Sequence, residues 1–163
     1  MALVRSAAEA EQRWFFGGGI HTWLAATEDT GGAYLLIHDE LVGGKATPLH
    51  VHPLSDESFY VLSGEIVVHL DGVEHPVQAG GIAMAPRGVP HAFVVVSATA
   101  ELLYLHTPGA CAAFYRGASE PLGEGREVDF DKVRAAAASD PGITLLGPPP
   151  FSHPGEVGAT MAR

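Results

Sequence analysis

Two histidines and a glutamate, His50, His52 and Glu57, lie within eight positions of one another. His50 and His52 are two residues apart, so an extended chain places both imidazoles on the same face of a strand. The intervening residues Pro53 to Asp56 predict a short turn that returns the chain onto a neighbouring strand at Glu57. Imidazole and carboxylate groups bind divalent transition metals. The spacing therefore predicts three metal ligands on one face.

A second stretch places another histidine directly after turn residues. Here the chain runs from Gly80 to Pro86, then Arg87-Gly88, and reaches His91 after Pro90. Proline and glycine in this order predict a turn that ends one strand and starts the next. His91 then heads a strongly β-forming run and is the candidate fourth ligand.

The stretches Gly44–Gly64 and Gly80–His91 together resemble the two motifs of the cupin superfamily, whose metal is held by three histidines and one glutamate. The fold that this resemblance implies is all-β, a jelly-roll barrel or double-stranded β-helix. One position departs from the motifs, because the closing asparagine of the family falls on Val95, which implies a more apolar pocket. Carried over residue by residue, the ligands are His50, His52, Glu57 and His91.

The middle of the chain consists of about eight to ten short β-forming runs separated by turn residues, without βαβ alternation. This pattern is typical of an all-β sandwich or barrel. Asp71-Gly72 predicts a two-residue hairpin. We expect the runs His91–Val96 and Ala100–Thr107 to pair as a final hairpin; which face of the second run points inward stays open.

The character of the chain changes after Pro108. Residues Ala110–Gly117 and Asp129–Ser139 predict two short helices packed on the outside of the barrel, and Pro148–Pro150 favours an extended tail. Such a tail resembles that of bacterial single-domain cupins similar to quercetin 2,3-dioxygenase. We therefore expect one domain, with an arm and first strands in residues 1–32, a barrel core in 33–108, and a helical segment with a Pro-rich tail in 109–163.

Composition excludes several classes of protein. The chain has 163 residues, 47% of them hydrophobic, and a formal net charge of -10, which suits one domain and disfavours nucleic acid or an anionic membrane as partner. The single cysteine, Cys111, fits a reducing compartment and is expected to be buried. Neither a signal peptide nor a bilayer-spanning apolar run is evident, so a cytoplasmic location is expected.

Other aromatic and histidine residues have two interpretations. Trp14 to Phe16 either close one end of their own barrel or contact a second copy, and the resemblance implies a homodimer. His69 and His75 flank the polar hairpin turn and are expected to be solvent-exposed.

Strand alternation places four apolar side chains beside the ligands. Phe59 and Val61 share the face of Glu57, and Phe93 and Val95 share that of His91. They predict an apolar pocket for an aromatic small molecule with two oxygens that chelate the metal. Fe, Mn, Ni, Co or Cu each suit the ligand set, Zn would also bind, and no organic cofactor is expected.

The resemblance implies a dioxygenase that cleaves a flavonol or similar enol with O2, with Glu57 taking the substrate's hydroxyl proton. Non-oxidative metal catalysis, such as polyketide cyclisation or isomerisation, and ligand binding without turnover stay open. The inward faces of the strands carry no Lys or Arg, and Arg87 lies on a turn. That distribution disfavours phosphorylated sugars as substrates.

Overall fold

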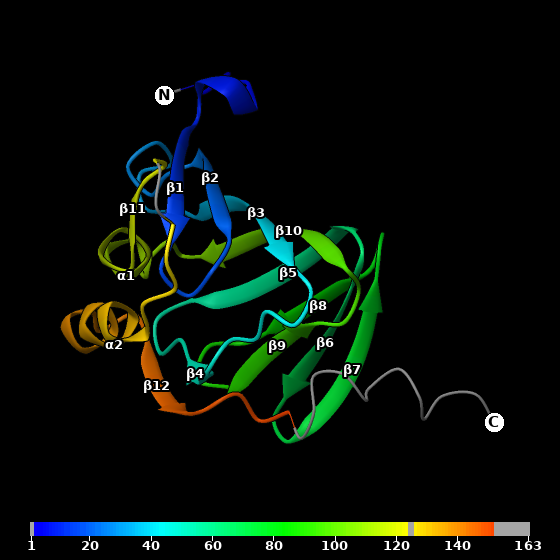
Figure 1. Cartoon of the computed structure of the whole chain (residues 1–163). Helices are drawn as coiled ribbons and strands as arrows, with labels where there is room; N and C mark the ends of the chain where they lie inside the picture. The colour runs from blue at the N-terminus through cyan, green and yellow to red at the C-terminus, as the bar shows by residue number, and fades with distance from the viewer. Residues whose placement is uncertain (1, 124–125, 152–163) are drawn as a thin grey trace.

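The computed structural model describes residues 2–123 and 126–151. Within these residues, two antiparallel β-sheets pack face to face and confirm the predicted jelly roll (Figure 1). In spatial order, the larger sheet consists of β11 (Ser119–Pro121), β1 (Glu11–Phe15), β2 (Ile20–Ala25), β3 (Leu35–Val42), β10 (Thr99–Thr107), β5 (Asp56–Ser63) and β8 (Ile82–Ala85). The smaller sheet consists of β12 (Thr144–Gly147), β4 (Leu49–Val51), β9 (His91–Val95), β6 (Glu65–Leu70) and β7 (Val73–Gln78).

Alternation along the strands determines which side chains enter the space between the sheets. Every second residue of β3 is buried from Leu35 to Leu41, as expected for a strand with one face on the core. Strand β10 buries Leu102, Tyr104 and His106 in the same way. The sequence left open which face of this strand points inward. The structure shows that it is the face that carries Tyr104 and His106.

The predicted turn between β6 and β7 is confirmed. Asp71 has a φ of 47° and Gly72 a φ of 86°, as a two-residue hairpin requires. The expected hairpin between β9 and β10 is wrong, because β9 pairs with β4 and β6 whereas β10 pairs with β3 and β5. The chain crosses from one sheet to the other between them, and a short polar connection fits either a hairpin or a crossover.

Both predicted helices form, as α1 (Ala112–Gly117) and α2 (Phe130–Ser139), preceded near the amino terminus by a 3-10 turn at Ala7–Glu9. The Asp129 carboxylate caps α2 by accepting hydrogen bonds from the backbone N–H groups of Asp131 and Lys132 at 3.0 and 3.1 Å. The helices pack together beside β11 and β12, outside the barrel (Figure 1). No helix in the two described ranges has the length and apolarity needed to cross a bilayer.

The amino-terminal aromatic residues pack on their own chain. Phe15 and Phe16 are buried, and Phe15 stacks on His21 with ring centroids 4.6 Å apart. Trp14 is half-buried and donates its indole N–H to the backbone oxygen of Glu127 at 2.9 Å. These contacts support the interpretation that this segment closes one end of the barrel.

Candidate metal centre

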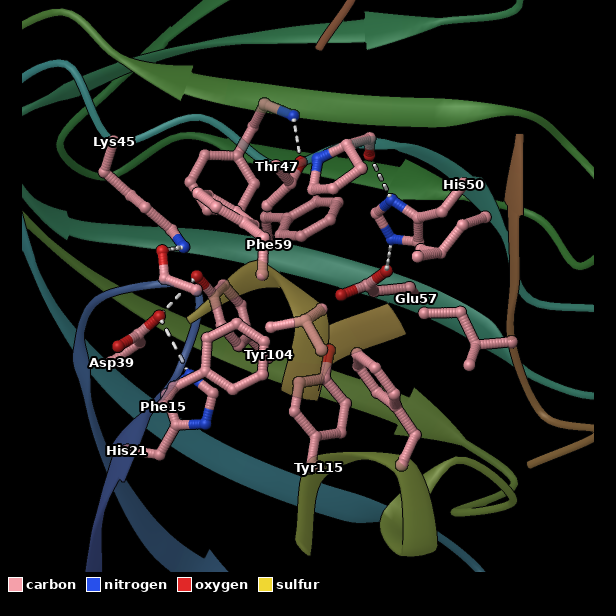
Figure 2. Close-up of a pocket in the computed structure, with 18 residues that line it drawn as sticks. Phe15, His21, Asp39, Lys45, Thr47, His50, Glu57, Phe59, Tyr104 and Tyr115 are labelled. Carbon is pink, nitrogen blue, oxygen red and sulfur yellow. Dashed lines mark hydrogen bonds and ion pairs between the residues drawn. The ribbon is translucent and has the colours of Figure 1, made fainter. Parts of the chain in front are cut away.

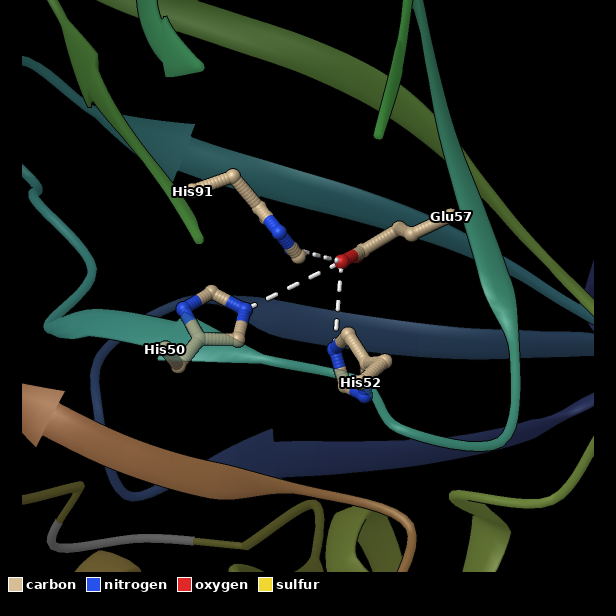
Figure 3. A group of neighbouring side chains, drawn as sticks. All are labelled: His50, His52, Glu57 and His91. Carbon is tan, nitrogen blue, oxygen red and sulfur yellow. Dashed lines mark hydrogen bonds and ion pairs between the residues drawn. The ribbon is translucent and has the colours of Figure 1, made fainter. Parts of the chain in front are cut away.

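The four predicted ligands meet between the two sheets. His50 on β4 lies directly across from His91 on β9, and His52 follows the end of β4. Glu57 enters from β5 in the opposite sheet. Figure 2 shows His50 and Glu57 at one end of a cavity, and Figure 3 shows all four side chains turned toward one point. All four are buried.

The geometry of the cluster is compact. Oε2 of Glu57 lies 2.8 Å from Nε2 of His91, 3.1 Å from Nε2 of His52 and 3.8 Å from Nε2 of His50. One ligand atom from each residue lies within 4.8 Å of the other three. The structure therefore brings together the four residues that the two sequence motifs indicate.

Backbone carbonyls orient all three histidines. The Nδ1 atoms of His50, His52 and His91 each lie 2.8 Å from a main-chain oxygen, those of Pro48, Gly142 and Val89 respectively. Because a carbonyl oxygen only accepts hydrogen bonds, each Nδ1 carries a proton and each ring turns its Nε2 toward the cluster.

The ionisation of the cluster fits a cation at its centre. Burial lowers the pKa of His50 to about 4, so the ring is neutral at pH 7. Burial alone would raise the pKa of Glu57, but the surrounding imidazoles hold it well below its ordinary value, so the carboxylate is ionised. Nε2 of His52 is buried without a hydrogen-bond partner among the described residues. Three imidazole nitrogens and one carboxylate oxygen that converge in this way form a donor set that suits a divalent transition metal.

Sequence reasoning missed two residues beside Glu57. His106 on β10 is paired with Glu57 in the sheet, and its Nε2 lies 3.3 Å from Oε1 of Glu57 and 3.0 Å from the hydroxyl of Tyr115 on α1. Burial lowers the pKa of His106 to about 3 and raises that of Tyr115 well above its ordinary value. The neutral imidazole therefore turns the same nitrogen, Nε2, to both the phenol and the Glu57 carboxylate. The alternation of β10 contained this signal, but its inward face was unassigned.

Cys111 also approaches the cluster. One atom each of His52, His106 and Cys111 lie within 4.8 Å of one another. The cysteine is fully buried, as expected, and burial raises the pKa of its thiol well above the ordinary value. A protonated thiol is a poor metal ligand, which leaves Cys111 as part of the core.

An aromatic cavity opens beside the cluster (Figure 2). Phe59 and Phe93 line it, as the strand alternation predicts, whereas Val61 and Val95 are fully buried in the core and are not among the lining residues. The space open to the centres of water-sized molecules is about 40 Å³, room for about three waters. Residues from the carboxy-terminal segment complete the wall, namely Phe114, Tyr115, Phe130, Val133, Ile143 and Leu145.

A second polar group lies in the same cavity. The hydroxyl of Tyr104 donates to Oδ2 of Asp39 at 2.7 Å, and Nε2 of His21 lies 3.3 Å from the same oxygen. Lys45 also lines the cavity, from the loop between β3 and β4. The expectation against anionic substrates did not include this residue. It rested on the strands alone, and a long side chain from a loop reaches the interior.

The two remaining histidines of the hairpin stay outside the cluster. His75 is exposed, as predicted. His69 is half-buried, with its ring centroid 6.3 Å from that of Phe151, so the expectation of full exposure is wrong for this residue. Its distant partner comes from the end of the described chain, which local sequence does not reveal.

Comparisons with known proteins agree with this geometry. Residues 38–107, which contain all four clustered side chains, match the cupin domain family. This chain is a cupin-domain protein. Quercetin 2,3-dioxygenase of Bacillus subtilis (strain 168) is 32% identical over 136 residues, which cover 78% of this chain and 40% of the dioxygenase. The cupin described here thus spans less than half the length of that relative.

Solved structures show the same fold. The protein TT1209 of Thermus thermophilus is 32% identical to this cupin, with a TM-score of 0.51 over 56% of this chain and 84% of that one. The polyketide cyclase RemF of Streptomyces resistomycificus is 24% identical, with a TM-score of 0.54 over 66% of this chain and 80% of that one. The likeness to RemF concerns the fold.

Proposed function

We propose that this cupin is a metal-dependent dioxygenase that cleaves a flavonol or a similar enol with O2. The observation that carries the proposal is the buried cluster, in which three histidines tied at Nδ1 turn Nε2 toward Glu57 at the end of an aromatic cavity. The 32% identity to a quercetin 2,3-dioxygenase supports the choice of reaction.

Glu57 has two distinct oxygens for this chemistry. Oε2 faces the three histidines, whereas Oε1 faces His106. When bound, the metal supplies Lewis acidity and redox chemistry toward an adjacent pair of substrate oxygens. Because the carboxylate is held ionised, Oε1 is ready to accept the hydroxyl proton of the substrate. His106 and Tyr115 fix the orientation of that oxygen.

The cavity walls select a flat substrate, and they must move apart to admit it. Phe59 and Phe93 present apolar surface to a flat ring and exclude water. A space of about 40 Å³ is too small for a flavonol, so the wall moves when the substrate enters. We expect this displacement at Phe130 and Leu145, which are incompletely buried.

Non-oxidative catalysis, such as cyclisation of a polyketide, is the second candidate. Asp39, Tyr104 and Lys45 give the cavity acid and base groups away from the metal cluster, which ring closure would use and oxygen addition does not require. Ligand binding without turnover would leave both sets of polar groups without a chemical role.

Oxygen uptake distinguishes these candidates. We would load the protein in turn with Fe, Mn, Ni, Co and Cu, add quercetin, and measure O2 consumption and ring-cleaved product. Glu57→Gln removes the carboxylate base, and His75→Ala is the control at an exposed histidine. Uptake that depends on one metal and on Glu57 supports the dioxygenase. Stoichiometric metal binding without uptake for any of the five metals would overturn it in favour of non-oxidative chemistry.

A further inference from the structure

Lys45 places a cation at the end of the cavity opposite the metal cluster. Figure 2 shows Lys45 and Asp39 on one side, His50 and Glu57 on the other, and Phe59 between them. The Nζ atom of Lys45 lies 5.1 Å from the centroid of the Phe15 ring, which forms part of the same cavity wall. The ammonium group is thus held at the inner surface of the pocket.

The chain supplies Lys45 with few partners. Its ammonium group donates a hydrogen bond to the backbone oxygen of Gly17, and no carboxylate of the residues that the structure describes lies within 4.0 Å of it. Asp39 acts on it from farther away: its Oδ2 faces Tyr104 and His21, and its Oδ1 has no hydrogen-bond partner among the described residues. An ammonium group has three donors, so two remain for a ligand.

Burial makes this arrangement costly without a ligand. Desolvation lowers the pKa of Lys45 to about 8, and the charge of Asp39 offsets this effect only in part. A positive charge in a largely apolar wall is stabilised by an anionic oxygen that enters the same space. The aromatic rings of Phe15, Phe59 and Phe93 line the path between that position and the metal cluster.

We propose that Lys45 binds an acidic oxygen, a carboxylate or phenolate, carried by an aromatic substrate at the end opposite its metal-chelating oxygens. The ring then lies against Phe59 and Phe93, whose own rings are in edge contact with centroids 5.7 Å apart, and the two polar ends fix its direction in the cavity. The metal end of this arrangement rests on the proposed function. The Lys45 end rests on the cavity and on the unfilled donors of the ammonium group.

Calorimetric titration with benzoate tests the Lys45 end alone. Benzoate has one ring and one acidic oxygen pair, and benzyl alcohol is its neutral counterpart. With metal-free protein, in which the benzoate carboxylate has no metal to bind, we expect Lys45→Met to weaken benzoate binding at least tenfold and to leave benzyl alcohol unchanged. The chain has one other lysine, Lys132, which is exposed on α2, so Lys132→Met is a matched control with unchanged affinity. Equal benzoate affinity in the wild type and Lys45→Met, or no binding to the wild type, would overturn the proposal.

A measurement on the wild-type protein tests the proposal even if the Lys45→Met variant misfolds. Limited acetylation with acetic anhydride, read by peptide mass spectrometry, reports the two lysines separately. We expect benzoate to slow acetylation of Lys45 at least threefold relative to Lys132, and an unchanged ratio would contradict the proposal. If benzoate binding depends on Lys45 but no O2 is consumed, the proposed dioxygenase function is refuted and the proposed Lys45 site is supported.

Discussion

At the residue scale, each histidine of the cluster uses one ring nitrogen for the backbone and keeps the other for a metal. Replacing His52 or His91 by alanine removes one of four donors and leaves the buried carboxylate of Glu57 less compensated. We expect each variant to lose metal affinity by more than about 100-fold, beyond the effect typical of losing only an outer partner. Metal content after dialysis and circular dichroism check this, with His75→Ala as the control. Unchanged metal content in both variants would refute the cluster as a metal centre.

Lys45 allows a prediction of stability against pH. Its pKa is about 8 in the folded protein and near 10.5 in the unfolded chain, so the buried charge destabilises the fold fully below pH 8 and ceases to do so as pH rises through 10.5. We expect Lys45→Met to raise the free energy of unfolding at pH 7 by about 1–3 kcal/mol, with a smaller gain at pH 10.

Urea denaturation of the metal-free protein at the two pH values measures this gain. Lys132→Met, which removes an exposed lysine, should leave the free energy of unfolding nearly unchanged at both. A Lys45→Met variant less stable than the wild type at pH 7 would show that Lys45 stabilises the fold. Such stabilisation would be inconsistent with an uncompensated charge.

Three of the four clustered residues follow from local rules, and the fourth, His91, follows from the resemblance to the cupin motifs. Alternation puts His50 and His52 on one face, and a short turn returns the chain at Glu57. His106 and Lys45 were missed for different reasons. The inward face of β10 depends on its pairing with β3 and β5, and the reach of Lys45 depends on where its loop crosses the barrel. Neither depends on nearby sequence.

At the scale of elements, two glycines of the motifs have the same backbone conformation but differ in how closely they are packed. Gly64 between β5 and β6 and Gly80 before β8 have nearly the same φ, 80° and 84°. A Cβ atom on Gly64 would lie 2.2 Å from the backbone oxygen of Thr99, whereas one on Gly80 would meet nothing within 4 Å. The connection from β5 to β6 therefore requires glycine both for its positive φ and for the lack of space beside Thr99.

Alanine substitutions at these positions give a matched pair. We expect Gly80→Ala to lower the free energy of unfolding by about 1 kcal/mol, the cost of a strained φ, and Gly64→Ala to lower it by at least about 2 kcal/mol more. Urea denaturation measures both. Equal losses would show that the chain at Thr99 shifts freely, in contrast to the tight contact described here.

The prediction of elements was accurate where composition and turn chemistry suffice. The Asp71-Gly72 turn and helix α2 both form close to their expected positions. Strand pairing was predicted less well, because β9 and β10 are neighbours in sequence but belong to different sheets. Which strands pair is determined by burial of both inner faces, a property of the whole barrel.

At the scale of the molecule, one face of the larger sheet is apolar and exposed. Tyr60 on β5 pairs with Ile82 on the edge strand β8, and they are 40% and 66% exposed, with Met84 beside them at 57%. Because Phe15 and Phe16 are buried in their own chain, this sheet face is the better site for the expected homodimer. We propose that it joins two copies.

Light scattering tests the dimer. We expect a molar mass of twice 17.0 kDa for the wild type and 17.0 kDa for Ile82→Glu, with metal content unchanged. Val73→Glu places the same charge at an exposed valine of β7, in the other sheet, and should leave the mass at twice the chain. A wild-type mass of 17.0 kDa would refute the proposed dimer.

The hydrogen bond between His52 and Gly142 spans 90 positions of the chain. On the ribosome, His50, His52, Glu57 and His91 are all synthesised before the residue that orients His52. A metal captured by the emerging polypeptide therefore meets an incompletely oriented site, from which ions exchange more readily. Tight retention begins only when the carboxy-terminal segment docks. We therefore expect the protein to select among competing metal ions only after the barrel has been synthesised.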